Sequence, residues 1–340
     1  MASSSIAAPS VLAETPSPRP GQAWTRMFHT KRGLLIAFLV PSLVILAGVV
    51  LVPLVYAFIL SLEGAQVTVI AGQGHVTGPF VGLANYLALM QNPGFWSALR
   101  TTLYFWLVSI GIEVVFGVGA AVLLNRAFPG KAIVRALVFI PWAIPTVVNA
   151  NLWGMILDGD PFGALNALLM QSHVTSSPVV WLNPSPILTQ WPLVSHIVTA
   201  LGGSLGLNWI IVGDEWHTLP IVIFLVLAGL QSVPQEYHEA ARIDGASRFQ
   251  TFRVVTFPLL SPVLAVVLVL RTMQLLRAFT IIFTLESTGL PVLSTLAYQY
   301  AFSFGYFGQG SAIAFLIGLL ALVVAFLYIT VLFRQEFSST

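Results

Sequence analysis

The stretch EAARIDGASRFQTFRVVTFPLL, residues 239–260, begins with charged and small residues and ends in an apolar run. It holds three arginines, two acidic residues and one glycine, and long apolar segments precede and follow it. The whole chain is 57% hydrophobic and only 8% charged, with a mean hydropathy of +0.90. Soluble domains carry about a quarter charged residues, so this composition indicates a membrane protein. The quoted stretch is therefore predicted to be a polar loop between two membrane-spanning helices.

Six apolar segments are long enough to cross a membrane, because a spanning helix needs roughly 20 mostly apolar residues. The six predicted spans are 33–61, 98–124, 133–157, 208–233, 259–285 and 309–333. A further apolar segment, 187–206, is interrupted by Pro192, Gly202 and Gly203. The predicted fold class is an all-α membrane protein with six transmembrane helices.

The basic residues decide between six spans and seven. With six spans, every basic loop lies on one side of the membrane, and the segments 62–97, 158–217 and 286–308 contain no Lys or Arg. The positive-inside rule then places both termini and these basic loops in the cytoplasm. The residues concerned are Arg26, Lys31, Arg32, Arg126, Lys131, Arg135, Arg242, Arg248, Arg253 and Arg334. A seventh crossing would move three of these arginines outside, so 187–206 is predicted to be an interfacial or re-entrant part of a long external loop, 158–207.

The remaining composition excludes several classes of function. Residues 1–32, rich in Ala, Ser and Pro, are predicted to be a disordered cytoplasmic tail, and 33–334 to be the transmembrane domain. The chain has no cysteine, and its net charge of +2 does not indicate nucleic-acid binding. It contains no phosphate-binding loop of the form GxxxxGK[ST], no HExxH, no GxSxG and no histidines at metal-ligand spacing. An enzyme or a metal site is therefore not indicated.

The polar loop, 234–258, is predicted to contain a short helix followed by a turn and a second helical stretch. Glu236 and Glu239 lie near the start of the first helix, where acidic side chains interact favourably with the helix dipole. Glu239 and Arg242 are spaced to pair on one face, and Gly245 can end the helix in the left-handed conformation. Such a helix, joined to a span at each end, would transmit movement directly to both spans.

The spacing within this loop resembles that of a known family. Glu-Ala-Ala is followed by three residues, Gly245, nine residues, Val255, one residue, Phe257 and Pro258. This pattern resembles the EAA loop of binding-protein-dependent ABC importer permeases, EAA-x3-G-x9-I-x-LP, with Val255 and Phe257 as departures. The stretches 80–102, 125–148 and 228–247 resemble the carbohydrate branch of that family. The resemblance covers about 33–333, and it weakens at 184–206 and in ESTGLPVLST after the fifth span.

The resemblance implies a type I importer permease, a multi-pass subunit of the cell membrane for a sugar or oligosaccharide. It implies three kinds of protein partner besides the lipid bilayer and its own solute: a second permease subunit in a heterodimer, a dimer of cytoplasmic ATPases, and an extracytoplasmic solute-binding protein. The loop would insert into a cleft on the ATPase, which would hold ATP and magnesium, so this chain would bind no cofactor. The residues that would form this contact are Glu239, Ala240, Ala241, Asp244 and Gly245.

Polar residues within the spans are the candidates for a solute site, because such groups usually face a cavity or one another. Arg271, Gln274 and Arg277 share one face of the fifth span, and Asp214 and Glu215 lie near the predicted start of the fourth. An ion pair of Arg271 with Asp214 or Glu215 is the purely structural interpretation. Glu113, Asn149 and Asn151 are more isolated, and Trp216 is a candidate to stack on a sugar. The substrate pocket that the resemblance implies contains Asp214, His217, Thr218, Ile221, Arg271, Gln274 and Ala278.

Three alternatives remain open at this point. Arg271 and Arg277 would suit a glycerol-phosphate importer or a permease for another anionic solute, since arginine binds phosphate and carboxylate groups. A secondary carrier would use Asp214 or Glu215 for proton coupling and would need no ATPase. A membrane-embedded enzyme would require a nucleophile, an acid and a base at one place, which the sequence does not indicate. The solute itself is not determined by the sequence.

Overall fold

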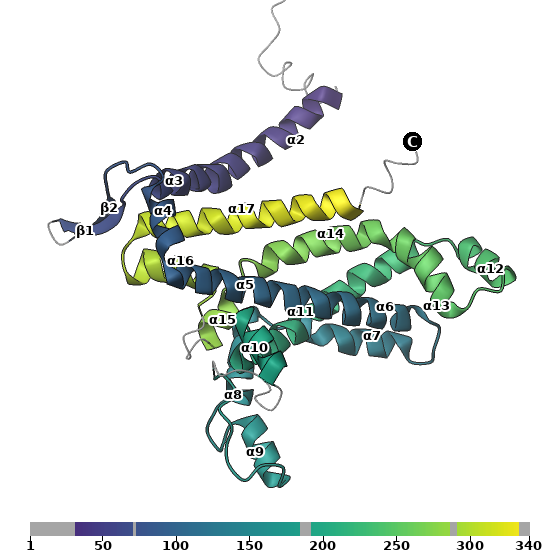
Figure 1. Ribbon diagram of the computed structural model, residues 1–340. Helices are drawn as coiled ribbons and strands as arrows, with labels where there is room; N and C mark the ends of the chain where they lie inside the picture. The colour runs from purple at the N-terminus through teal and green to yellow at the C-terminus, as the bar shows by residue number, and fades with distance from the viewer. Residues whose placement is uncertain (1–30, 71–72, 184–191, 286–290, 333–340) are drawn as a thin grey trace, which may run out of the picture. The chain divides into compact units, whose positions relative to one another are not determined.

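A computed structural model describes residues 31–70, 73–183, 192–285 and 291–332 of the 340-residue chain (Figure 1). Contacts divide the chain into two compact units, with the boundary in the sequence between Ala57 and Phe58, and each unit is described by itself. Of the predicted tail, only Lys31 and Arg32 lie within the described residues, where they begin the first helix. The helices are α2 (Lys31–Leu46), α3 (Val52–Ser61), α4 (Ala84–Gln91), α5 (Pro93–Ile112), α6 (Val118–Asn125), α7 (Lys131–Phe139), α8 (Thr146–Ile156), α9 (Ala164–Gln171), α10 (Pro192–Ala200), α11 (Leu205–Gln231), α12 (Gln235–Ile243), α13 (Arg248–Thr251), α14 (Phe257–Leu275), α15 (Thr280–Leu285), α16 (Leu293–Tyr298) and α17 (Phe307–Leu332).

Several of these helices are connected by, or run into, a short π-helical or 3₁₀ segment. π-helical turns at Ala47–Leu51, Glu113–Gly117 and Phe252–Thr256 connect α2 to α3, α5 to α6 and α13 to α14. Another, Gln299–Ser303, follows α16, and a 3₁₀ turn at Ile140–Ala143 follows α7. Turns of this kind are common inside long helices and often lie at functional positions.

Six helical segments of the described chain have the length and composition to cross a membrane. Five are continuous: Phe38–Ser61, Pro93–Asn125, Leu205–Gln231, Arg248–Leu285 and Phe307–Tyr328. The sixth is a pair, Lys131–Ala143 and Thr146–Ile156, bent by 93° at the break between them. The six predicted spans are all present, and the third is broken.

The break in the third span follows from two prolines in the stretch IPWAIP. Pro141 and Pro145 lack the backbone N–H that an inner helical turn needs, and proline disfavours the helical conformation of the residue before it. Ile144 accordingly has φ −76° and ψ 133°, and Asn149 N donates to Pro145 O at 3.0 Å as α8 begins. The bend leaves the carbonyl of Ile144 outside any helical ladder, available to a side chain.

In the described part of the predicted external loop, the short helices α9 and α10 precede the start of α11. α10 has nine residues, far fewer than the roughly 20 that a crossing needs. This agrees with the prediction that 187–206 is not a full span, although 184–191 lie outside the described residues. The turn after α10 packs closely on α5: a Cβ on Gly202, whose φ is +94°, would stand 2.8 Å from the backbone of Arg100. Glycine is thus required there both for the conformation and for the contact.

A two-stranded hairpin in the segment 62–97 is a feature that the sequence analysis did not predict. β1 (Gln66–Ile70) pairs antiparallel with β2 (Gln73–Thr77) in the register Gln66↔Thr77 to Ile70↔Gln73. Val67 N donates to Gly305 O at 3.0 Å, which attaches the hairpin to the chain before α17. The hairpin adds a small element to a described chain that is otherwise helical.

α11 lies at the centre of the larger unit and packs against α5, α6, α8, α14 and α15 (Figure 1). More than half of its 27 residues are buried, and apolar residues occur all round the helix. A helix that is hydrophobic on every side is typical of the core of a bundle. The polar residues of α11 are therefore placed among other helices.

Candidate functional site

The polar loop has the predicted helix–turn–helix structure. α12 starts directly after Pro234, has Glu236 in its first turn and Arg242 in its last, and ends before Gly245 at φ +76°. Ala246 N donates to Ala241 O at 2.9 Å, which closes the end of the helix around this left-handed residue. The predicted role of Gly245 in ending the helix is thereby confirmed.

The second half of the loop leads into α14 without a break. Ser247 and Gln250 form a reciprocal cap at the start of α13, with Ser247 N donating to Gln250 Oε1 at 2.8 Å and Gln250 N donating to Ser247 Oγ at 3.3 Å. α13, the π-helical turn and α14 follow in continuous helical conformation. Displacement of α12 would therefore move α14 as well as α11.

The five predicted coupling residues all lie on the surface of this loop. Glu239, Ala240, Asp244 and Gly245 are exposed and Ala241 is half-buried. The predicted pair of Glu239 with Arg242 is wrong, because the ion pairs that the structure shows in the described residues all involve Arg271.

Large apolar side chains on the loop are exposed as well, a signal that the sequence analysis did not use. The exposed fractions are 86% for Ile243, 72% for Phe249 and 72% for Val254. Exposed apolar groups of this size are candidates for contact with a partner. They lie in different helical segments on the two sides of the turn at Gly245, so no local pattern in the sequence marks them.

A second region lies among the spans, where all seven residues of the implied substrate pocket line one cavity of about 520 Å³. α11 contributes Asp214, His217, Thr218 and Ile221, and α14 contributes Arg271 and Gln274, with Ala278 just beyond it. The other lining residues are Trp142, Thr146, Leu275, Arg277, Phe279, Thr280 and Ile281. The structure brings the predicted set together, and its role in binding a solute remains a prediction.

Arg271 is buried and all of its guanidinium nitrogens are engaged. Nε donates to Glu113 Oε1 at 2.5 Å, Nη1 to Gln274 Oε1 at 2.6 Å, and Nη2 to Thr218 Oγ1 at 2.9 Å. Nη2 also lies 3.7 Å from Asp214 Oδ2. The tightest partner is thus Glu113, from a helix 158 positions earlier, and the expectation that Glu113 stands isolated is wrong.

Glu113 is the important residue of this cluster that the sequence analysis did not assign to the site. Its exposed fraction is 1%, and it lies where α5 passes into the π-helical turn. A carboxylate in an apolar span was itself a usable signal, because intramembrane ionisable groups nearly always have a partner. The sequence could not show that the partner was Arg271.

The polar residues of α11 lie deeper in the helix than predicted. α11 starts at Leu205, capped by Ser204 Oγ, which accepts from Leu207 N at 3.1 Å. Asp214 is therefore more than two turns inside the helix, not near its start. Leu205, Gly206 and Leu207 extend the span by three residues beyond its predicted start at 208.

The broken third span and α11 are joined by side chains from both. His217 Nε2 lies 2.9 Å from the carbonyl oxygen of Ile144, the group released by the proline bend. Asn149 Nδ2 donates to Gly213 O at 3.2 Å, so this residue is not isolated either. Each bond gives a buried polar side chain a hydrogen-bond partner inside the bundle.

Glu215 adds a third carboxylate next to the cluster but does not line the cavity. It is 4% exposed. Neither oxygen makes a hydrogen bond of ordinary geometry within the described residues. The cluster therefore contains more acidic than basic groups.

Aromatic residues are arranged differently from the expectation. Trp216, the predicted stacking residue, packs edge-to-face against Trp153 with ring centroids 6.3 Å apart and does not line the cavity. Trp142, from the bend of the third span, lines it instead and is 42% exposed. A tryptophan between two prolines carries no local signal for this role, because its direction depends on the bend.

The amino-acid sequence matches one protein family and is similar to permease proteins of two transport systems. The family described as "Binding-protein-dependent transport system inner membrane component" matches residues 113–338. The chain is 36% identical over 303 residues to the trehalose/maltose transport system permease protein MalF of Thermococcus litoralis, covering 88% of this chain and 93% of that protein. It is 31% identical over 305 residues to the trehalose transport system permease protein SugA of Mycobacterium tuberculosis, covering 88% of each.

A solved structure shows the same fold. The crystal structure of a bacterial ABC transporter involved in the import of the acidic polysaccharide alginate contains a chain that superposes with a TM-score of 0.69 at 20% identity. The match covers 92% of this chain and 99% of that one.

Proposed function

Because the chain belongs to the family of binding-protein-dependent transport system inner membrane components, we propose that it is the permease subunit through which an ATP-driven importer takes up a sugar or oligosaccharide. Members of this family are multi-pass proteins of the cytoplasmic membrane. The solute class is supported by relatives named for trehalose and maltose that align over most of the chain.

The observation that supports a neutral solute best is that every guanidinium nitrogen of Arg271 already has a partner within the chain. Glu113 and Asp214 balance its charge, and Gln274 and Thr218 accept from Nη1 and Nη2. An anion bound by arginine needs paired N–H groups in a fork, and here those nitrogens already donate to side chains of the protein. Asp214, the Gln274 amide and the face of Trp142 suit the hydroxyl groups and the apolar face of a sugar ring.

One residue favours the alternative of an anionic solute such as glycerol phosphate. Arg277 lines the same cavity, is exposed, and forms no ion pair with any described residue. It could bind a phosphate or carboxylate directly. Arg271 therefore favours a neutral solute and Arg277 an anionic one, and an uptake experiment has to decide between the two classes of solute.

The proposed assembly contains further chains. ATP and magnesium would be held by two copies of a cytoplasmic ATPase, since this sequence has no phosphate-binding loop. A second, related permease subunit would complete the pathway, and a solute-binding protein would deliver the solute outside. In a solved relative of the same fold, the alginate transporter was crystallised with its periplasmic protein carrying an alginate pentasaccharide.

In the proposed cycle, the ATPase contacts α12 through Glu239, Ala240, Ala241, Asp244 and Gly245. The short connection from α11 and the continuous helix into α14 would transmit its movement to both walls of the cavity. Asp214 and Arg271 lie on these two walls, so the cavity would change shape when α12 moves. Coupling and solute binding would thus be linked through two helices.

The decisive experiment is purification of the chain from its native membrane in mild detergent, with mass spectrometry of the associated proteins. A P-loop ATPase and a second polytopic chain are expected. The complex is then placed in proteoliposomes, and ATP-dependent uptake of labelled trehalose, maltose and glycerol 3-phosphate is compared. Uptake by the chain alone, driven by a proton gradient, would instead establish a secondary carrier.

A further inference from the structure

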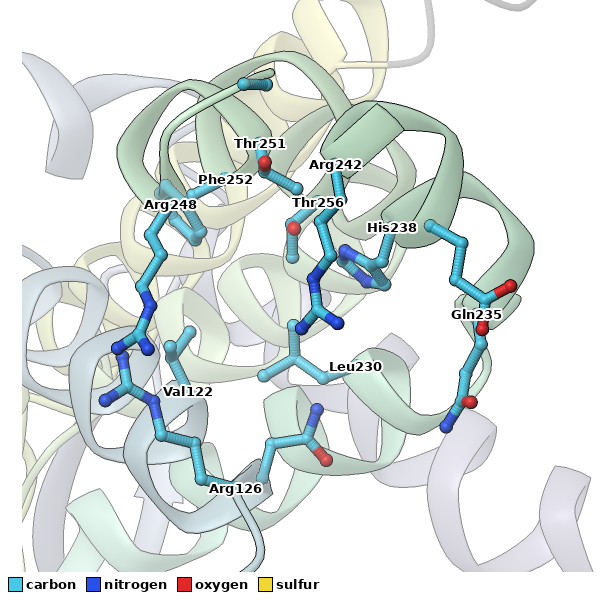
Figure 2. A pocket seen from close by; sticks show the side chains of 13 residues that line it. Val122, Arg126, Leu230, Gln235, His238, Arg242, Arg248, Thr251, Phe252 and Thr256 are labelled. Carbon is cyan, nitrogen blue, oxygen red and sulfur yellow. The ribbon is translucent and has the colours of Figure 1, made fainter. Parts of the chain in front are cut away.

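A second, larger cavity lies between the end of α6 and the polar loop. Its volume is about 760 Å³, and it is lined by residues of α6, α11, α12, α13 and the π-helical turn after α13 (Figure 2). Of the predicted coupling residues only Glu239 lines it, and it shares no lining residue with the cavity among the spans. The residues that line the cavity form two groups, one basic and one apolar.

The basic part consists of three arginines from three different segments. Figure 2 shows Arg126, Arg242 and Arg248 extending into the cavity, with His238 nearby. Glu239 is the acidic residue among those that line it, and no ion pair to any of these arginines forms within the described residues. Three guanidinium groups around one space repel one another unless an anion lies between them.

The end of α6 does not neutralise these arginines. Its terminal carbonyl groups already accept from two other basic residues: Arg135 Nη2 donates to Leu124 O at 2.9 Å, and Lys131 Nζ lies 3.4 Å from Asn125 O. The negative partial charge at the C-terminal end of α6 is thus already paired with these two cationic side chains. The carbonyls of Leu124 and Asn125 are thus already paired with basic residues other than the three arginines of the cavity.

The apolar part is formed by the ends of membrane-spanning helices. Val122 on α6, Leu230 on α11 and Phe252 in the turn before α14 line the inner side of the cavity, together with Thr256. Apolar walls therefore give way to arginines at the level where the spans end. This change from apolar to cationic matches the order of groups in a phospholipid, whose acyl chains begin next to its phosphate.

We propose that this cavity binds the headgroup of an anionic phospholipid, with Arg126 and Arg248 on the phosphodiester oxygens and the first acyl segments against Val122 and Phe252. Arginine binds phosphate oxygens through paired N–H groups, and basic pockets between spans on the cytoplasmic side bind anionic headgroups. A carboxylate from a protein partner would meet the same arginines, but it would leave the apolar wall uncovered. The lipid would connect α6 to the loop that α12 begins, and so influence the movement of that loop.

The test compares two pairs of substitutions in the purified transporter complex. The variant Arg126→Gln/Arg248→Gln removes two arginines of the cavity and leaves the predicted coupling residues unchanged. The matched control is Arg253→Gln, because Arg253 is an exposed arginine of the same loop that does not line the cavity. A second variant, Arg126→Lys/Arg248→Lys, keeps the charges and reports whether the site still folds.

Each complex is reconstituted in phosphatidylcholine nanodiscs with increasing phosphatidylglycerol, and retained phosphatidylglycerol is counted by native mass spectrometry. The double glutamine variant is expected to bind phosphatidylglycerol roughly thirtyfold more weakly, from the loss of two arginine contacts near the membrane surface. The control and the lysine variant are expected to stay close to the unmodified complex. Equal retention in the double glutamine variant and the control would overturn the proposal.

Two further outcomes would identify another occupant. Displacement of phosphatidylglycerol by inorganic phosphate at lower concentration than the lipid itself would show a site for free phosphate. The double glutamine variant could instead retain phosphatidylglycerol normally in mixed nanodiscs and lose the ATPase subunit in nanodiscs of pure phosphatidylcholine. That result would show a protein-docking surface. Either result would contradict the lipid assignment without affecting the assignment of the chain as a permease.

Discussion

The two arginine-containing regions of this protein differ in how their charges are satisfied. Arg271, 4% exposed among the spans, has a partner for every guanidinium nitrogen, and its nearest carboxylate comes from another helix. Arg242 and Arg248, in the polar loop, are exposed and pair with no carboxylate of a described residue. The buried charge is neutralised within the chain, whereas the loop charges have no such partner among the described residues. This difference supports the proposal that the loop arginines bind another molecule, while Arg271 holds helices together.

Removal of Glu113 is expected to have the largest effect on the protein. Glu113→Leu would leave Arg271 charged and without its main partner, and breaking a buried pair from one side costs about 3–5 kcal/mol. We expect a large fall in the unfolding temperature, measured by fluorescence-detected size-exclusion chromatography after heating. The double variant Glu113→Leu/Arg271→Met should recover most of the loss, because removing both charges leaves no unpaired guanidinium. An unchanged unfolding temperature in the single variant would mean that the pair does not stabilise the fold.

Charge reversal at Glu239 is expected to leave the fold intact and to reduce transport. Glu239 is exposed and pairs with no described residue, so Glu239→Lys removes no contact within the chain. A misplaced charge at a docking surface costs several kcal/mol, which corresponds to about a hundredfold loss of ATP-dependent uptake. Glu236→Lys, on the same helix and also exposed, is the control and should transport normally. Equal loss in both variants would contradict a specific contact at Glu239.

Substitution of Gly245 tests the geometry of the same surface. At φ +76° an alanine costs about 1–2 kcal/mol, so Gly245→Ala should shift the end of α12 and lower uptake by about tenfold. Gly130→Ala is a matched control, since Gly130 has φ +79°, lies in another loop, and likewise has open space where a Cβ would stand. ATP hydrolysis and uptake are measured together, and continued hydrolysis with reduced uptake is expected for Gly245→Ala alone. A similar defect in both variants would indicate backbone strain instead of lost coupling.

The smallest effect is expected at Arg277, which lines the proposed solute cavity and forms no ion pair with any described residue. For a neutral sugar, Arg277→Gln should change uptake by less than about threefold, because an exposed charge contributes little to a neutral ligand. For an anionic solute, the loss of a charge-assisted contact should exceed about tenfold. Uptake of labelled trehalose and of glycerol 3-phosphate by the variant and the unmodified complex separates the two cases. A loss above tenfold with trehalose would contradict the neutral-solute proposal.

Local patterns in the sequence predicted much of this molecule. The lengths of the apolar runs gave the spans, because a helix must satisfy all its own backbone groups to cross a bilayer. The end of α12 at Gly245 was predictable because glycine tolerates the left-handed conformation at no steric cost. Seven of the residues that line the proposed solute cavity were predicted through the family resemblance, not from composition or spacing, and the other seven were not predicted for it.

Other features depended on contacts that no short stretch encodes. The π-helical turns, the hairpin of β1 and β2 and the place of Trp142 at the cavity all depend on neighbours that pack against them. α11 is apolar on every side, so its sequence does not specify which face meets α5 and which meets α14. For that reason the sequence could supply Glu113 and Arg271 but not their pairing.

By itself, the sequence determined the apolar spans, the polar loop with its glycine turn, and the set of ionisable residues placed within the membrane. These properties follow from hydropathy, helix periodicity and backbone sterics, which act over a few neighbouring residues. The tertiary structure alone decided that Glu113 neutralises Arg271, that His217 meets the carbonyl freed at Ile144, and that three arginines surround one cavity beside the loop. Those outcomes require helices distant in sequence to pack in one particular orientation, and packing is a property of the whole bundle.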